Sequence, residues 1–150
     1  MQTERIQRVC IDVKNLDEGI KQFSAALGIT FNRVHMEPVP FDVISSGPVD
    51  PLLEKVKTTG IAVSETGVEL VETDPPCAKE GIRSVIYKVP NLEESKAAME
   101  KKGVGMMVEV VWKGGLKEAV FGPVNLHGVR LALIEYTTPT LFEAMMGPGK

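Results

Sequence analysis

Apolar and polar side chains alternate over residues 5–13, and this period of two predicts a β-strand. The period then changes to that of a helix, with apolar side chains at Leu16, Ile20, Phe23 and Leu27. Asn15 precedes this stretch in the position of a helix N-cap, and Gly28 follows it as a C-terminal stop. The beginning of the chain therefore predicts a strand and a helix, with a second strand over residues 29–34.

The stretch from residue 36 to residue 54 is the least regular part of the chain, and it contains four prolines. Such a composition predicts a long loop, with a short strand or turn at residues 41–44. Long loops inside compact domains are often lids or pocket walls. After this loop, residues 61–64 and 68–72 are predicted to form a β-hairpin.

The second half of the chain repeats the pattern of the first. Residues 13–18 read VKNLDE and residues 89–94 read VPNLEE, and each copy follows a strand pattern and opens a helix pattern. The second helix is predicted to end at Gly103, and strands are expected at residues 106–112, 118–121 and 129–136. Asn-Leu followed by two acids is a common helix start, but the order of elements also agrees in both halves, which favours an internal duplication.

This order of elements predicts an α+β fold of two tandem βαβββ modules around one pocket. We expect a single domain over residues 1–150, with module one at about residues 4–73 and module two at about residues 81–137. The remaining tail, residues 138–150, has a weakly amphipathic stretch at 140–146 that predicts a short helix.

Composition and charge narrow the class of protein. The formal net charge is −3, and the longest basic cluster is the pair Lys101 and Lys102, so the sequence offers no nucleic-acid footprint. No apolar stretch approaches the roughly 20 residues that span a bilayer, and the charged N-terminus does not read as a signal peptide. Cys10 and Cys77 form no metal-type pair and are expected to be reduced, which predicts a cytoplasmic protein.

Three segments of the chain resemble the vicinal oxygen chelate superfamily, which includes glyoxalases, extradiol dioxygenases, bleomycin-resistance proteins and methylmalonyl-CoA epimerases. They are the opening strand and helix start at residues 5–18, the strand GVELVE at residues 67–72, and the ending LHGVRLAL at residues 126–133. The likeness is greatest to the epimerase-like members. It implies a glyoxalase-like half-barrel that encloses one pocket, and in such families a homodimer is one expected assembly.

The resemblance also indicates where metal-dependent relatives hold their ion. Carried over residue by residue, the four ligand positions fall on Arg8, Glu69, Ser84 and Ala132. Only Glu69 has a good ligand atom, because a guanidinium repels a cation and alanine has nothing to donate. His127 is expected to be structural, and His35 lies near the irregular loop. We therefore expect that the metal site is lost and that no cofactor is bound.

Strand alternation predicts which side chains share the inner face with Arg8 and Glu69. The predicted ligand-binding residues are Asp12, Ser84, Lys88, Trp112 and Arg130. The sequence leaves two interpretations of Arg8 and Glu69 open. Either they form an internal ion pair that holds the modules together, or Arg8 binds a substrate oxyanion while Glu69 transfers a proton.

Three functions follow from this pocket. The first is a metal-independent epimerase, isomerase or lyase that acts on a small carboxylate or carbonyl compound, with Glu69 and Arg8 as catalytic residues. The second is a small-molecule binding protein of the bleomycin-resistance kind, with apolar walls from Phe41, Trp112, Phe121 and the methionines. The third, a metal-dependent glyoxalase or dioxygenase, is disfavoured by the missing ligands. Nothing in the sequence identifies the ligand.

Overall fold

The computed structural model describes residues 5–47 and 55–148. The charged N-terminus, part of the predicted loop at 36–54 and the end of the tail lie outside these residues. Nine strands form one sheet: β1 (Ile6–Asp12), β2 (Asn32–Arg33), β3 (Phe41–Ser46), β4 (Lys57–Val63), β5 (Val68–Asp74), β6 (Gly81–Lys88), β7 (Met106–Trp112), β8 (Lys117–Phe121) and β9 (Arg130–Glu135). The three α-helices are α1 (Leu16–Leu27), α2 (Leu92–Lys101) and α3 (Leu141–Met146), and a 3₁₀ turn lies at Val124–Leu126.

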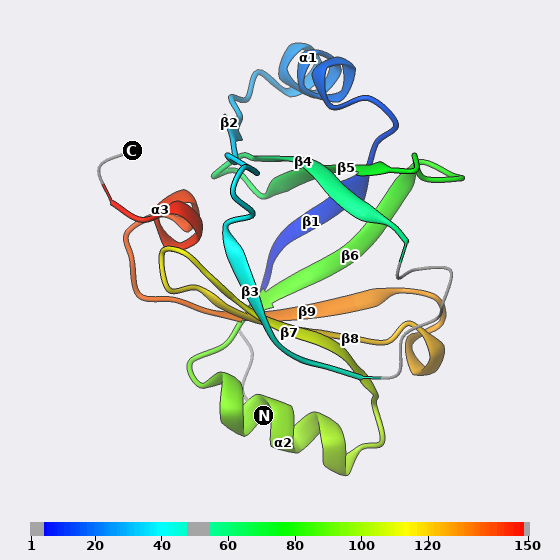
Figure 1. Cartoon of the computed structure of the whole chain (residues 1–150), viewed down its shortest axis with the longest axis vertical. Helices are drawn as coiled ribbons and strands as arrows, with labels where there is room; N and C mark the ends of the chain where they lie inside the picture. The colour runs from blue at the N-terminus through cyan, green and yellow to red at the C-terminus, as the bar shows by residue number, and fades with distance from the viewer. Residues whose placement is uncertain (1–4, 48–54, 149–150) are drawn as a thin grey trace.

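The sheet is mixed and curls into a half-barrel (Figure 1). Its strand order is β2-β4-β5-β1-β6-β9-β8-β7-β3. β1 and β6 pair antiparallel at the middle, whereas β1 pairs parallel with β5 and β6 pairs parallel with β9. Apart from β3, the strands of the first and second halves of the chain therefore lie on either side of the β1–β6 contact, and the curl brings their inner faces toward one hollow.

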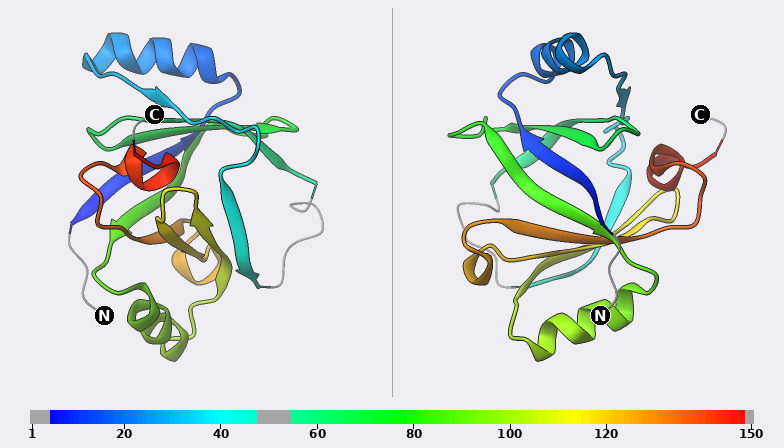
Figure 2. Two further views of the ribbon diagram at one scale, coloured as in Figure 1. Left: turned by 60° about the vertical axis from the view of Figure 1, so that its left-hand side comes forward. Right: turned by 180° about the vertical axis from the view of Figure 1, so that it is seen from behind.

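Helices α1 and α2 cover the outside of the curl at its two ends, and α3 lies on the inside (Figures 1 and 2). Each outer helix has its own small core. Leu16 packs with Ala62 and Leu70 under α1. Leu92 and Met99 pack with strands β8 and β9 under α2. The largest core fills the hollow itself, and it contains the buried face of α3.

The predicted helix starts are confirmed. The side-chain oxygen of Asn15 accepts a hydrogen bond from the backbone N–H of Glu18 at 2.9 Å, and that of Asn91 accepts from Glu94 at 3.0 Å. A second anchor was not expected from the sequence: Glu72 accepts the Leu16 N–H at 2.9 Å, and Glu135 accepts the Leu92 N–H at 2.7 Å. A carboxylate from a strand thus satisfies a free donor in the first turn of both helices.

Strand β3 departs from the predicted arrangement. It is longer than the expected stretch at 41–44, and it pairs with β7 of the second half rather than with its own half. Strand β2 is shorter than the predicted strand at 29–34. These two strands are the edges of the sheet. The tandem βαβββ arrangement therefore remains a prediction, because one strand of the first half belongs spatially to the second.

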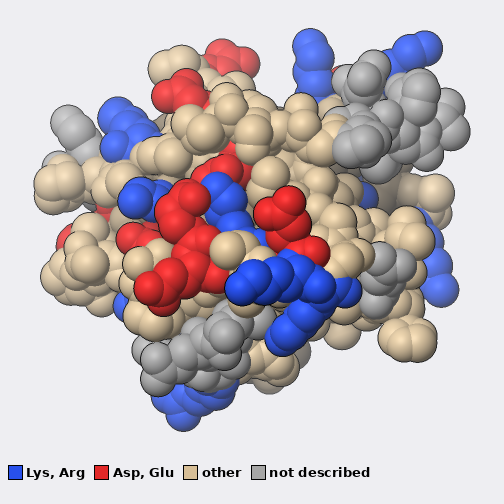
Figure 3. Space-filling model, turned by 90° about the horizontal axis from the view of Figure 1, so that it is seen from below, with Lys and Arg blue, Asp and Glu red and all other residues tan. Residues whose placement is uncertain are grey.

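The face that carries α2 has acidic and basic side chains side by side (Figure 3). Lys96 on α2 binds Glu93 at 3.0 Å and also reaches Glu109 on β7 at 2.9 Å. Glu109 is 7% exposed, so this second pair ties the helix to a buried position in the sheet. Among the described residues, no helix is long and apolar enough to cross a bilayer.

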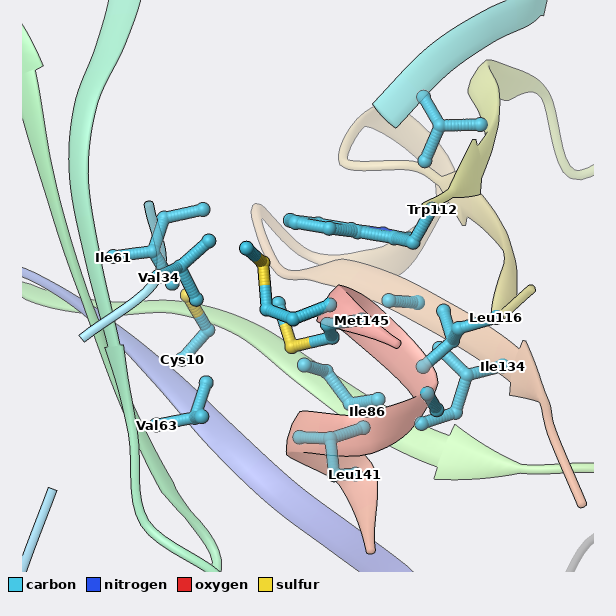
Figure 4. Close-up of a cluster of buried hydrophobic side chains, with 14 of the residues drawn as sticks. Cys10, Val34, Ile61, Val63, Ile86, Trp112, Leu116, Ile134, Leu141 and Met145 are labelled. Atoms are coloured by element: carbon cyan, nitrogen blue, oxygen red, sulfur yellow. The ribbon is translucent and has the colours of Figure 1, made fainter. Parts of the chain in front are cut away.

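The predicted helix in the tail is confirmed, and the structure shows what it does. Helix α3 inserts Leu141, Ala144, Met145 and Met146 into the hollow of the sheet, where all four are buried. Figure 4 shows Met145 in the middle of this cluster, between Trp112 and the strands that carry Cys10 and Ile61. The Glu65 carboxylate accepts the N–H groups of Leu141 and Phe142 at 3.1 and 3.3 Å. The tail is therefore part of the core.

Gly114 allows α3 to approach the β7–β8 turn, and its replacement gives a test of this docking. A Cβ at Gly114 would lie 2.2 Å from the Glu143 carbonyl oxygen, which is backbone and cannot rotate away. We expect Gly114→Ala to lower the free energy of unfolding by about 1–3 kcal/mol. The Leu116 amide, which donates to the Ala144 carbonyl at 3.0 Å, should then exchange with deuterium faster.

The matched control for this substitution is Gly105→Ala. A Cβ at Gly105 meets nothing within 4 Å, and its backbone has no positive φ. Unchanged Leu116 exchange in Gly114→Ala would show that α3 is not held by this close approach.

Candidate functional site

The hollow of the sheet contains a pocket of about 230 Å³. Its walls come from β1 and from β3 through β9, and its charged members are Glu69, Arg83, Glu118 and Arg130. A larger open groove of about 680 Å³ lies outside the hollow, beside the start of α1 and strands β2 and β4. We place the candidate site in the pocket of about 230 Å³, because it has room for a ligand and is lined by Glu69 and Glu118, titratable groups with shifted pKa values from the two halves of the chain.

Glu118 on β8 is a carboxyl of the pocket with a strongly shifted pKa. Burial, and after it the charge of Glu69, raise this pKa to about 7. The Trp112 indole N–H donates to Glu118 Oε1 at 3.0 Å, and this bond favours the ionised form but does not offset burial. Glu118 is therefore poised to exchange a proton near neutral pH.

Glu69 on β5 faces the same space. Burial raises the pKa of this carboxyl, and Arg8 is the main influence that opposes the rise. In the sheet order, strands β1, β6 and β9 separate β5 from β8. Only the curl of the sheet lets the two glutamates border one cavity.

The raised pKa of Glu118 also makes stability depend on pH. The folded protein holds this proton up to about pH 7, whereas the unfolded chain releases it near 4.5. The contribution of Glu118 to stability is therefore complete below pH 4.5 and is lost as the pH rises through 7. We expect Glu118→Gln to remove a fall of up to about 3 kcal/mol between pH 5 and pH 8, measured by urea unfolding.

Glu93→Gln on the exposed surface of α2 is the control for that titration, and its stability should follow the same pH curve as the wild type. If the free energy of unfolding of Glu118→Gln changes with pH in parallel to that of the wild type, Glu118 titrates normally in the folded protein.

Arg8 on β1 lies beneath α3 and does not line the pocket of about 230 Å³. Its side chain is 2% exposed, and it borders a separate cavity of about 20 Å³ together with Glu69, Glu118, Leu141 and Met145. That volume holds about one water molecule and excludes a substrate. Arg8 Nη1 lies 4.0 Å from Glu69 Oε1 and has no hydrogen-bond partner among the described residues. This placement favours the ion-pair reading of Arg8 over direct contact with a ligand.

Two arginines that line the pocket come from adjacent strands. Arg130 on β9 is aligned with Ser84 on β6, and Arg83 immediately precedes Ser84. The pairing of β1 with β6 shifts between Cys10 and Ile11, so Arg83 is an unpaired bulge residue. A bulge re-aims a side chain, and this one places Arg83 beside Ser84 on the pocket wall although alternation alone would point it outward. Arg83 Nη1 binds Asp12 Oδ1 at 2.9 Å.

The predicted ligand-binding residues divide into two groups. Ser84, Trp112 and Arg130 line the pocket. Asp12 and Lys88 do not, because β1 and β6 run antiparallel and place these residues at opposite ends of the pair: Asp12 aligns with Gly81, whereas Lys88 lies beyond the pairing of Tyr87 with Ile6. Asp12 forms an ion pair with Arg83, and the Lys88 ammonium lies 4.0 Å from the centre of the Tyr136 ring.

The apolar part of the pocket is also partly as predicted. Phe41 and Trp112 form a tilted pair with ring centres 4.8 Å apart, and Met107 lines the same wall. Phe121 is instead fully buried beneath α2, outside the pocket. Cys10 lines the pocket, but burial raises the pKa of its thiol well above the usual value, and the charge of Glu69 adds to this rise. A thiol in that state is a poor nucleophile.

The sequence interpretation missed Glu118 and Arg83. Glu118 could have been found, because it shares a strand face with Val120, which lines the pocket as an apolar residue of β8 should. No sequence signal marks the bulge that re-aims Arg83.

The sequence resemblance predicts four ligand positions at Arg8, Glu69, Ser84 and Ala132. Arg8 and Ala132 occupy two of them, and both are buried. The described residues contain no group of three or more His, Cys, Asp or Glu that could hold a metal ion. His35 and His127 are exposed and line neither the pocket nor the small cavity below α3.

Several solved structures have the same fold as this chain. A Streptomyces coelicolor methylmalonyl-CoA epimerase variant in complex with 2-nitronate-propionyl-CoA aligns with a TM-score of 0.61 and 16% identity, over 93% of this chain and 99% of that chain. A hypothetical protein from Bacillus halodurans gives 0.60 and 18%, over 91% and 96%. The Mycobacterium tuberculosis methylmalonyl-CoA epimerase gives 0.56 and 14%, over 89% and 88%.

No family model matches the chain, and no curated protein sequence is significantly similar to it. At identities of 14–18% the structural likeness concerns the fold. The curled sheet with its outer helices α1 and α2 is thus the vicinal oxygen chelate fold that the sequence motifs predicted.

Proposed function

We propose that this protein is a metal-independent epimerase or isomerase that moves a proton on a small carbonyl or carboxylate compound in the pocket of about 230 Å³. The observation that carries the proposal is Glu118, whose pKa of about 7 lies where a general acid or base works best. Glu69, a second carboxyl with a raised pKa, borders the same space.

In the proposed reaction one carboxylate removes a proton from carbon next to a carbonyl, which breaks the C–H bond and leaves an enolate. The other carboxyl, in its protonated form, then delivers a proton to carbon and forms a new C–H bond. Delivery to the opposite face inverts the centre, and delivery to a neighbouring atom isomerises the compound. No electron is gained or lost overall. The arginines on the pocket wall would stabilise the enolate oxygen.

A divalent metal has no part in this proposal, because the residues at the family's ligand positions do not suit one. Arg8 places a permanent cation beside Glu69, its one possible ligand there, and Ala132 offers no donor atom. We propose that Arg8 takes over one task of the lost metal, which is to hold Glu69 in place and oppose the rise of its pKa.

The neighbours with the same fold support an epimerase-type reaction but do not carry their substrate to this chain. Two of them are methylmalonyl-CoA epimerases, and the Streptomyces coelicolor variant is in complex with 2-nitronate-propionyl-CoA. The pocket here is smaller than the roughly 300–1,000 Å³ of pockets that bury drug-sized ligands. We therefore propose a small substrate, or at most a small reacting end of a larger one.

A binding protein without catalysis is the second candidate. The tilted pair of Phe41 and Trp112 and the aliphatic residues around it favour it, because aromatic walls are typical of pockets that hold apolar ligands. Two carboxyls with raised pKa values have no role in such a pocket, and for this reason we place catalysis first.

The two halves of the chain, about residues 4–73 and 81–137, are proposed to be copies of one module. The matching bonds of Glu72 to Leu16 and of Glu135 to Leu92 support this, because the same strand-to-helix contact occurs at the same place in each half.

Deuterium exchange tests the proposed activity. The protein is incubated in D₂O containing EDTA with a panel of small oxo acids and 2-methyl-branched carbonyl compounds, and loss of the C–H signal is followed by proton NMR. We expect exchange with at least one compound that is faster than the buffer rate and unaffected by EDTA. Saturable binding of the same compounds without exchange would contradict the enzyme activity and support the binding function instead.

A further inference from the structure

The wall of the pocket formed by β6 and β9 carries more positive charge than its protein partners neutralise. Arg83 has Asp12 as its ion-pair partner at 2.9 Å. Arg130 is half-buried, and no hydrogen bond or ion pair joins its guanidinium to another described residue. On this wall two guanidinium groups thus share one carboxylate, while Glu69 and Glu118 face the same pocket from β5 and β8.

The electrostatics of Arg130 agree with this count. Burial lowers its pKa, and the neighbouring charge of Arg83 lowers it further. Asp12 acts in the opposite direction and does not offset these two influences. A half-buried cation beside a second cation is costly unless an anion compensates it. The cost is removed when an oxyanion accepts hydrogen bonds from both guanidinium groups, for which the planar fork of arginine is well suited.

The other walls of the pocket combine the carboxyls Glu69 and Glu118 with an apolar surface. That surface consists of Phe41, Trp112 and aliphatic side chains such as Ile61, Val71 and Ile86. A ligand that fits therefore has an anion at one end and a short apolar body. Because Glu69 and Glu118 also face this pocket, a monoanion suits it better than a phosphate ester, which carries about −1.5 to −2 near neutral pH.

We propose that Arg83 and Arg130 form an anion subsite that anchors the carboxylate of a short-chain monocarboxylate substrate. This inference rests on the proposed function and adds the substrate class to it. With the carboxylate on the arginines, the body of the molecule lies along the aromatic wall and its reacting carbon lies toward Glu69 and Glu118. The carbonyl that activates that carbon makes the substrate a short oxo acid.

The test compares butyrate with butyramide, which have nearly the same shape and differ in charge. Each is titrated into the protein at constant ionic strength and followed by ligand-observed NMR. We expect butyrate to bind at least tenfold more tightly than butyramide. Arg130→Gln, verified as folded by circular dichroism, should lose this preference. Arg33→Gln, whose partner Asp17 lies on the surface, should keep it.

Inorganic phosphate provides the third arm of the experiment. Phosphate that binds more tightly than butyrate would overturn the assignment of a carboxylate, and equal binding of butyrate and butyramide would overturn the anion subsite. Absence of saturable butyrate binding, or full binding by Arg130→Gln, would overturn it as well.

The same titration on Glu118→Gln separates this inference from the proposed activity. Glu118 does not belong to the anion subsite, so the variant should bind butyrate at least as well as the wild type. If the wild type binds butyrate but exchanges no C–H proton with any compound, the proposed reaction is contradicted and the anion subsite is still supported.

Discussion

Replacing Arg8 with methionine should lower the free energy of unfolding by about 3–5 kcal/mol at pH 8, because it leaves the Glu69 carboxylate buried without its cation. Methionine retains much of the apolar stem, so the loss of charge dominates over the loss of packing. The effect should shrink at pH 5. Burial already raises the pKa of Glu69, and Arg8 is the main group that opposes this rise, so the variant takes up a proton at Glu69 more readily. Urea unfolding at the two pH values measures the difference.

A double-mutant cycle assigns that loss to the ion pair. Glu69→Gln alone should also destabilise the protein, since it leaves the Arg8 guanidinium buried with no carboxylate. The double variant should recover much of the loss, because neither charge then remains in the core. Arg33→Met, at a side chain that is 54% exposed, should change stability by no more than about 0.5 kcal/mol. Simple additivity of the Arg8 and Glu69 effects would contradict an ion pair across their 4.0 Å separation.

Arg8 and helix α3 meet at one end of the hollow. Arg8 and Glu69 border a cavity of about 20 Å³ there, together with Leu141 and Met145 of α3. The Arg8 guanidinium thus lies at the end of the hollow that α3 covers. The space that remains for a ligand lies farther along β6, where Glu118, Arg83 and Arg130 are found.

The fold followed from the sequence because its signals are local. Asn15 and Asn91 each cap a helix through one side-chain oxygen, and these bonds need only the next three residues. Strand β3 was placed less well, since its partner β7 lies in the other half of the chain. A pairing over such a distance depends on how the sheet curls, and strand periodicity carries no information on the curl.

The candidate site was only partly predictable for the same reason. Glu69, Ser84 and Arg130 were found because strict alternation holds at those positions. Arg83 was missed because one bulge breaks the alternation. Lys88 was included as the equivalent of Asp12, but β1 and β6 run antiparallel, so equivalent positions lie at opposite ends of the pair. The shifted pKa of Glu118 arises from burial and from Glu69, and three strands lie between their strands in the sheet, so the shift exists only in the folded chain.

Glu118→Gln should reduce the proposed C–H exchange by about 10²–10⁴-fold, because glutamine retains the shape of the side chain but cannot take or give a proton. With the wild type, the exchange rate should rise with pH through about 7 if Glu118 acts as the base. Glu69→Gln should slow epimerisation by a similar factor in both directions, because each turnover uses both carboxyls. C–H exchange should be lost only for the stereoisomer whose proton faces Glu69, since each carboxyl would serve one face. Exchange rates from proton NMR in D₂O, at several pH values, measure both effects.

Two controls are needed to interpret the exchange rate of Glu118→Gln. Glu93→Gln on the outer surface of α2 should exchange at the wild-type rate, which controls for the removal of one carboxylate from the protein. Binding of butyrate by Glu118→Gln shows that the pocket is intact when the rate falls. Exchange that persists in Glu118→Gln but disappears in Glu69→Gln would make Glu69 the only proton carrier, and Glu118 would then act on it through charge alone.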